Sequence, residues 1–146
     1  MEELEKLRQW LVTFPKWETG GPLYIDFTDG QPGSAGLYPQ GMEEVRRVTD
    51  ITGTVTVCCR WNFVLYRMTQ LQEDNEADAG WLMAFQQWVQ QQCAAGLAPV
   101  FGDEPSQERI CAQKGRLLKA NEAGTVRYSV ELTVEFVKHQ IDTRRK

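Results

Sequence analysis

Four cysteines and one histidine are the residues whose types could hold a metal ion or attack a substrate. A structural zinc site is typically built on closely spaced ligands such as Cys-x-x-Cys. Here Cys58 and Cys59 are adjacent, which would send their side chains to opposite faces of a strand, while Cys93, Cys111 and His139 stand far apart in the sequence. The spacing therefore predicts no metal site, and we expect the four cysteines to be free thiols.

A cysteine nucleophile needs a histidine within hydrogen-bond reach, and Cys111 with His139 is the pair to consider. Residues 121–124 read Asn-Glu-Ala-Gly, a turn that would join two strands. In that hairpin Cys111 lies opposite a residue near Val134, and His139 lies opposite residues 105–106. The two side chains are then several residues apart, so we expect no catalytic pair.

The absence of other catalytic motifs also predicts that the protein is not an enzyme. The chain has no Gly-x-Ser-x-Gly, no Walker loop and no Gly-x-Gly-x-x-Gly, the sequences that present a serine nucleophile or bind a phosphate. Asp26 and Asp29 are three residues apart in an extended segment and project to opposite faces instead of forming an acid and base pair. We expect no catalytic residue, no cofactor and no bound metal.

One stretch is locally basic, although the whole chain has a formal charge of −4. Its basic side chains lie between residues 109 and 127 (Arg109, Lys114, Arg116, Lys119 and Arg127). A solvated face is the first interpretation of this stretch, and contact with an acidic protein surface or with passing nucleic acid are the alternatives. Because the chain lacks an overall basic excess, we expect no sequence-specific binding of nucleic acid.

The spacing of apolar side chains predicts two helices. Between residues 75 and 96 these side chains follow one helical stripe, with acids at its start and Gly96 at its end (Trp81, Leu82, Phe85, Trp88 and Val89). This stripe indicates a long amphipathic helix around which the fold is organised. A second stripe covers residues 2–14, where Pro15 blocks its extension.

Alternation of apolar and polar residues predicts the strands. The strands expected are 23–27, 54–70, 109–119 and 125–138. The second of these is unusually long for a strand. Residues 42–50 are compatible with a charged edge strand or a short helix, and residues 99–102 with a very short strand.

The segment 30–41 contains four glycines and two prolines, which predicts a flexible loop. Long loops in compact domains are often binding segments. We expect this loop to contact a partner that buries its apolar side chains, and an ordinary surface excursion is the alternative. The candidate contact residues are Gly30, Pro32, Gly33, Leu37, Tyr38 and Pro39.

Together these elements predict one α+β domain over residues 1–146. It would be an antiparallel β-sheet meander with one long central helix packed on one face and an N-terminal helix. The tail 141–146 is expected to fray. The chain has no apolar run of ~18 residues and no basic-then-apolar leader, so we expect an intracellular protein without a membrane partner.

Four short sequences spread over the chain stand out together. They are Leu-x-x-Leu-Arg-Gln-Trp-Leu at 4–11, Pro-Gly-Ser-x-Gly-Leu-Tyr-Pro-x-Gly at 32–41, Trp-Val-Gln-x-Gln at 88–92 continuing to Gly-Leu-Ala-Pro-x-Phe-Gly at 96–102, and Asn-x-Ala-Gly-Thr at 121–125. With them the chain resembles small proteins encoded among the minor capsid and tail genes of tailed phages and prophages of gut Firmicutes. The order of elements also resembles that of phage tail terminator and tail completion proteins.

This resemblance implies a non-enzymatic virion assembly protein, a tail terminator or head-tail joining subunit. Such a protein would form a homo-oligomeric ring, typically a hexamer, that closes the tail tube and meets the head connector proteins. It would reside in the virion, and in the bacterial cytoplasm during assembly. The alternative from a different class is a small-molecule or regulatory binding domain that uses the aromatic-rich face of the sheet.

Overall fold

The computed structural model describes residues 2–17, 23–26, 34–70, 76–120 and 125–141. In these ranges the chain forms two helices, five strands and a single 3-10 turn. In chain order they are α1 (Glu2–Leu11), β1 (Leu23–Ile25), β2 (Ala35–Thr49), β3 (Thr54–Gln70), α2 (Glu76–Ala94), η1 (Pro105–Gln107), β4 (Arg109–Ala120) and β5 (Thr125–Ile141).

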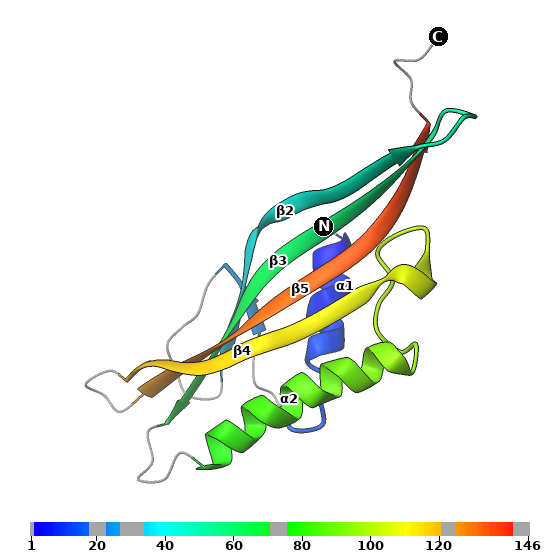
Figure 1. Ribbon diagram of the computed structural model, residues 1–146. Helices are drawn as coiled ribbons and strands as arrows, with labels where there is room; N and C mark the ends of the chain where they lie inside the picture. Colours follow the sequence, from blue (N-terminus) through cyan, green and yellow to red (C-terminus); the bar gives the residue numbers. More distant parts are fainter. Residues whose placement is uncertain (1, 18–22, 27–33, 71–75, 121–124, 142–146) are drawn as a thin grey trace.

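The five strands form one sheet in the order β1-β2-β3-β5-β4 (Figure 1). Strand β1 runs parallel to β2 and pairs only with Ala35–Leu37, while every other neighbouring pair is antiparallel. Strands β3 and β5 are paired along their whole length, from Thr54 opposite Ile141 to Gln70 opposite Thr125. With 17 residues each, β3 and β5 are the longest strands of the sheet.

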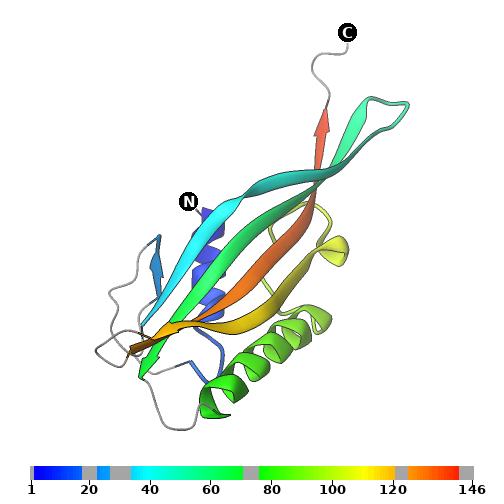
Figure 2. The same ribbon diagram turned by 60° about the vertical axis from the view of Figure 1, so that its left-hand side comes forward.

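The expectation of an antiparallel meander organised around one long central helix is wrong. The sheet is mixed, and the two helices are short beside it. The 19 residues of α2 span about 28 Å, half of the ~56 Å that the 17 residues of β3 can span. Helix α2 runs along the edge strand β4 (Figure 2). Apolar periodicity marks a helix but encodes neither the strand that it contacts nor the direction of a strand such as β1.

Some of the other predicted elements are confirmed, and others are wrong. The strand expected at 54–70 is confirmed as β3, and residues 42–50 are resolved as strand up to Thr49. The loop expected over 30–41 is wrong from Ala35 onward, where β2 begins. A bulge between Pro39 and Gly41 accommodates these two residues in the strand, and Gly41 takes a positive φ of 134°. Residues 99–102 form no strand, and the end of the tail lies outside the described residues.

The core lies between one face of the sheet and the two helices. Alternate side chains of β5 from Val126 to Phe136 are buried in it. The stripe expected on α2 is confirmed at Trp81, Leu82, Phe85 and Val89, which are buried, whereas Trp88 is half-buried. Trp88 stacks on Trp10 of α1 with ring centroids 4.9 Å apart. The second half of the stripe therefore joins the two helices.

Candidate functional site

Strands β2 and β3 continue as a hairpin beyond both helices (Figures 1 and 2). Asp50 closes the turn at its end, because its carboxylate accepts hydrogen bonds from the backbone N–H groups of Thr52 (2.9 Å) and Thr54 (3.0 Å). Gly53 takes a positive φ of 91°, which glycine adopts without strain. The hydrogen bond from the Thr52 hydroxyl, followed by the backbone hydrogen bonds, lowers the pKa of Asp50. The tip is thus a defined turn.

The outer edge of β2 is open over most of its length. Strand β1 pairs only with Ala35–Leu37, and in the described ranges no strand pairs with β2 on that side beyond Leu37. Every residue from Pro39 to Thr49 is exposed. A free strand edge presents rows of N–H and C=O groups that can pair with a strand of another chain.

Helix α2 covers the opposite edge of the sheet. The Cys93 thiol accepts a hydrogen bond from the backbone N–H of Ile110 in β4 and donates one to its carbonyl, both at 3.4 Å. Further along β4, the Gln86 side chain accepts the N–H of Gly115 at 3.4 Å. Two side chains of the helix therefore occupy hydrogen-bonding groups that a neighbouring strand would otherwise take.

The same cover continues where β5 extends past β4. The Asp103 N–H donates to the carbonyl of Val137, and the Asp103 carboxylate accepts the N–H of His139, each at 2.7 Å. Gly102 makes this approach possible, because a Cβ there would lie 2.4 Å from the Val137 oxygen. The open edge of β2 is therefore distinct from the covered edge on the other side of the sheet.

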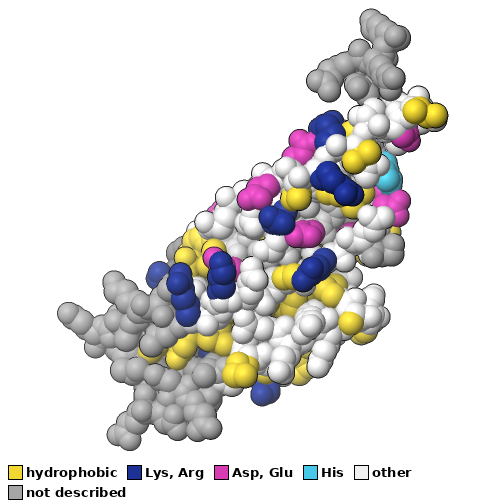
Figure 3. All heavy atoms as spheres, viewed as in Figure 1, with side chains coloured by type: hydrophobic (Ala, Val, Ile, Leu, Met, Phe, Trp, Pro, Cys, Tyr) yellow, Lys and Arg dark blue, Asp and Glu magenta, His cyan; other side chains and the backbone are white. Residues whose placement is uncertain are grey.

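Apolar side chains on the hairpin face the solvent, and Figure 3 shows hydrophobic groups towards its end. They are Met42 (59% exposed), Val45 (50%), Val48 (48%) and Ile51 (98%). Acidic residues precede Val45 and basic residues follow it. Single exposed apolar residues are ordinary, but several along one free strand edge form a surface suited to another protein.

A second bulge changes the direction of the side chains in the middle of β2. The register with β3 shifts between Glu44 and Arg46, which leaves Val45 without a partner on β3. Glu44 and Arg47 form an ion pair across this bulge, with Oε1 and Nε 2.5 Å apart. Both side chains are more than two fifths exposed, so charged groups of another molecule can reach this ion pair.

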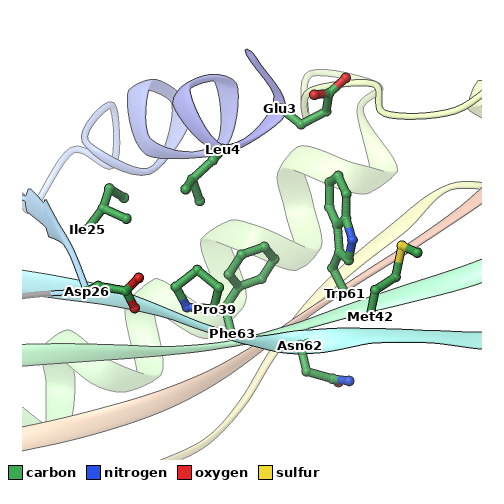
Figure 4. Close-up of a pocket in the computed structure, with 10 residues that line it drawn as sticks. Glu3, Leu4, Ile25, Asp26, Pro39, Met42, Trp61, Asn62 and Phe63 are labelled. Carbon is green, nitrogen blue, oxygen red and sulfur yellow. The ribbon is translucent and has the colours of Figure 1, made fainter. Parts of the chain in front are cut away.

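A cavity of about 430 Å³ lies where the hairpin leaves the body of the molecule (Figure 4). Trp61 and Phe63 of β3 and Leu4 of α1 form apolar walls, and Glu3 and Asp26 are its acidic residues. Ligand sites typically have volumes of ~300–1,000 Å³. The cavity is therefore large enough for a small, mainly apolar molecule.

Charges of both signs are interspersed over the strands in Figure 3. The Arg60 guanidinium lies 3.0 Å from Glu135 and 3.4 Å from Glu43, and Lys114 lies 3.4 Å from Glu131. The basic residues expected at 109–127 therefore include one that is paired with an acid on the neighbouring strand. This mixed surface fits the interpretation as a solvated face.

The structure separates the residues of the expected contact loop. Three of them lie outside the described residues (Gly30, Pro32 and Gly33). Leu37 is fully buried in the core, and Tyr38 is half-buried with its ring 5.1 Å from that of Tyr66. Pro39 is exposed and lines the cavity. Leu37 is thus a core residue, because pairing of β2 with β3 orders this segment within the chain.

Sequence reasoning gave the edge strand only as one of two alternatives for residues 42–50. Its signal is in residues 42–50, where charged residues surround Val45 and Val48, a composition typical of an edge strand. The same residues also fit a short helix, and nothing in their order says which neighbour is missing. Only the pairing of the strands identifies the edge.

The cysteines and the histidine do not come together. Cys111 lies opposite Thr133 of β5, and His139 lies farther along the same strand, where its Nε2 is 2.8 Å from Glu104. All four cysteines are free, and burial raises the pKa of Cys59 and Cys93. Among the residues that the structure describes, no group of three or more His, Cys, Asp or Glu could hold a metal ion.

Comparison with models of known protein families and with curated protein sequences gave no match. In the described part of the chain, neither helix has the length and apolar character needed to cross a membrane.

Proposed function

We propose that this protein is a non-enzymatic subunit of a tailed-phage virion that binds other protein chains through the β2–β3 hairpin. The observation that carries the proposal is the open edge of β2, in a sheet whose other edge is covered by α2 and Asp103. Natural proteins usually protect long strand edges, and an edge left open is a ready site for strand addition.

Strand addition explains how such a surface would work. Backbone hydrogen bonds to the partner strand would each contribute about 0.5–1.5 kcal/mol net. Burial of the exposed Met42 and Val48 side chains would add to the affinity, and the charges around Val45 would select the partner. The function needs no catalytic group.

The resemblance to tail terminator and head-tail joining proteins supports a place at the end of the tail tube. In this role the subunit would form a ring and contact the tail tube protein on one side and the head connector on the other. A ring requires that two different surfaces of each subunit meet, so the hairpin of one subunit would contact the body of the next.

The proposal is tested by placing charges on the edge. Val45→Lys with Val48→Lys should abolish binding to assembled tail tubes and leave the melting temperature nearly unchanged, because both residues are exposed. The measurements are co-sedimentation with tubes of the encoding phage and thermal unfolding.

The matched control is Val12→Lys with Val100→Lys, which changes two valines of similar exposure away from the hairpin. This control should bind like the unchanged protein. Equal binding by both double variants would rule out the hairpin as the assembly surface.

A second candidate function rests on the cavity beside Trp61, which fits a small-molecule or regulatory binding domain. A ligand that binds there should raise the melting temperature and change tryptophan fluorescence, and Trp61→Ala should abolish both effects. A ligand effect that survives Trp61→Ala would place binding elsewhere.

A further inference from the structure

We infer that two copies of this chain pair through the open edge of β2, antiparallel and about a two-fold axis at the Val45 bulge. This inference goes beyond the proposed function. It says which chain pairs with the edge of β2 in the isolated protein, and it does not depend on the role of the protein in a virion. The occupant is a second copy, and the charges on β2 select it.

The bulge sets which side chains share a face. Glu44 lies opposite Cys59 and Arg47 lies opposite Val57, two β3 residues that alternate along the strand and are both buried on the core side. Glu44 and Arg47 therefore project from the same face of β2, although an uninterrupted strand would send residues three apart to opposite faces. Their ion pair at 2.5 Å follows from this arrangement.

This arrangement makes the edge complementary to itself. A two-fold axis at the bulge places Glu44 of each copy opposite Arg47 of the other, so that two ion pairs cross the interface on the same face. They join the two pairs within the chains into a closed set of four alternating charges. Opposite charges directly across an antiparallel pair are stabilising, and like charges there are destabilising.

The same charges disfavour two of the neighbouring symmetric registers. If the two-fold axis moved from the bulge to Arg47, towards the tip of the hairpin, Arg47 would lie opposite Arg47 of the other copy. If the axis moved the other way, to Glu44, then Glu44 would lie opposite Glu44 of the other copy. Of these three registers, only the one centred on the bulge brings Glu44 opposite Arg47 of the other copy.

Backbone pairing would then extend from Met42 to Thr49 in each copy, all of which is exposed in the single chain. Val45 and Arg46 of each copy lie nearest to the axis, with Val45 of one copy opposite Arg46 of the other. The sheets of both copies become continuous, and the free edge disappears. Addition of another protein to this edge would first require the two copies to separate.

Charge reversal tests the pairing. Glu44→Arg or Arg47→Glu turns both cross-strand pairs into repulsions and should raise the dissociation constant of the dimer ~10-fold or more. Sedimentation equilibrium over a range of protein concentrations measures it. Mixing the two variants restores both cross-strand attractions, so the mixture should form a heterodimer although neither variant pairs with itself.

The mixture distinguishes pairing between chains from an effect within one chain. In each variant the two charges at positions 44 and 47 of the same chain become like charges, and mixing the variants does not change that. The matched control is Arg8→Glu, which reverses an exposed ion pair of the same spacing, Glu5 with Arg8 on α1. This variant should dimerise like the unchanged protein.

The inference predicts a dimer for the unchanged chain, weakened by added salt. A monomer at every concentration, no heterodimer in the mixture, or equal weakening by Arg8→Glu would each overturn it.

Discussion

At the scale of single residues, Asp50 determines the shape of the hairpin tip. Its carboxylate accepts two backbone N–H groups and the Thr52 hydroxyl at 2.6 Å. These hydrogen bonds favour the charged form and lower the pKa of Asp50 in the folded chain. The order of the turn is therefore linked to pH.

Because the folded pKa lies below the unfolded value, the contribution of Asp50 is present above ~3.9, the ordinary pKa of Asp, and is lost as the pH falls through the folded value. We expect the Thr52 and Thr54 amides to exchange hydrogen more slowly in the unchanged protein than in Asp50→Asn at neutral pH. The difference should vanish in acid. NMR-detected exchange measures it, and a difference that persists in acid would show that the carboxylate charge has no role.

At the scale of elements, α2 has two kinds of contact along one stripe. Phe85 is fully buried, stacks on Trp81 at 5.3 Å and meets Phe14 edge-on at 5.4 Å. Trp88 is half-buried and lies against Trp10 of α1. The two aromatic residues therefore differ in the cavity that each would leave.

Phe85→Ala should lower the free energy of unfolding by ~3–5 kcal/mol, the range for a large aromatic removed from a core. Trp88→Ala should lower it less, because part of that side chain already contacts water. Urea denaturation of the two variants gives the comparison. A larger loss for Trp88→Ala would mean that the contact between α1 and α2, instead of the core beneath the sheet, limits stability.

At the scale of the whole molecule, the central strand pair is non-local. Strand β3 pairs with β5 across the intervening α2 and β4, with Thr54 opposite Ile141. The chain must close these long loops before the central contacts can form, which slows folding.

We therefore expect refolding in roughly milliseconds to seconds, the range of domains dominated by non-local strand pairs. Stopped-flow tryptophan fluorescence measures this rate, since Trp10 and Trp88 lie where the two helices meet and Trp81 stacks on the buried Phe85. Complete refolding within microseconds would show that local helical contacts control folding instead.

The sequence by itself determined where strands and helices lie when their periodicity is strong. Strand β3 from Thr54 to Gln70 and the buried stripe from Trp81 to Val89 follow from the spacing of apolar side chains, since alternation and helical repeats are local properties of the chain. The missing motifs and the separation of Cys111 from His139 along a hairpin also follow from local order.

Only the tertiary structure decided which edges of the sheet are open. The parallel pairing of β1, the burial of Leu37 and the cover of β4 by Cys93 depend on residues far apart in the chain. The bulge at Val45, which brings Glu44 and Arg47 to one face, depends on the register with β3. Spacing along one strand contains no information about that register, and so the candidate site could not be read from the sequence.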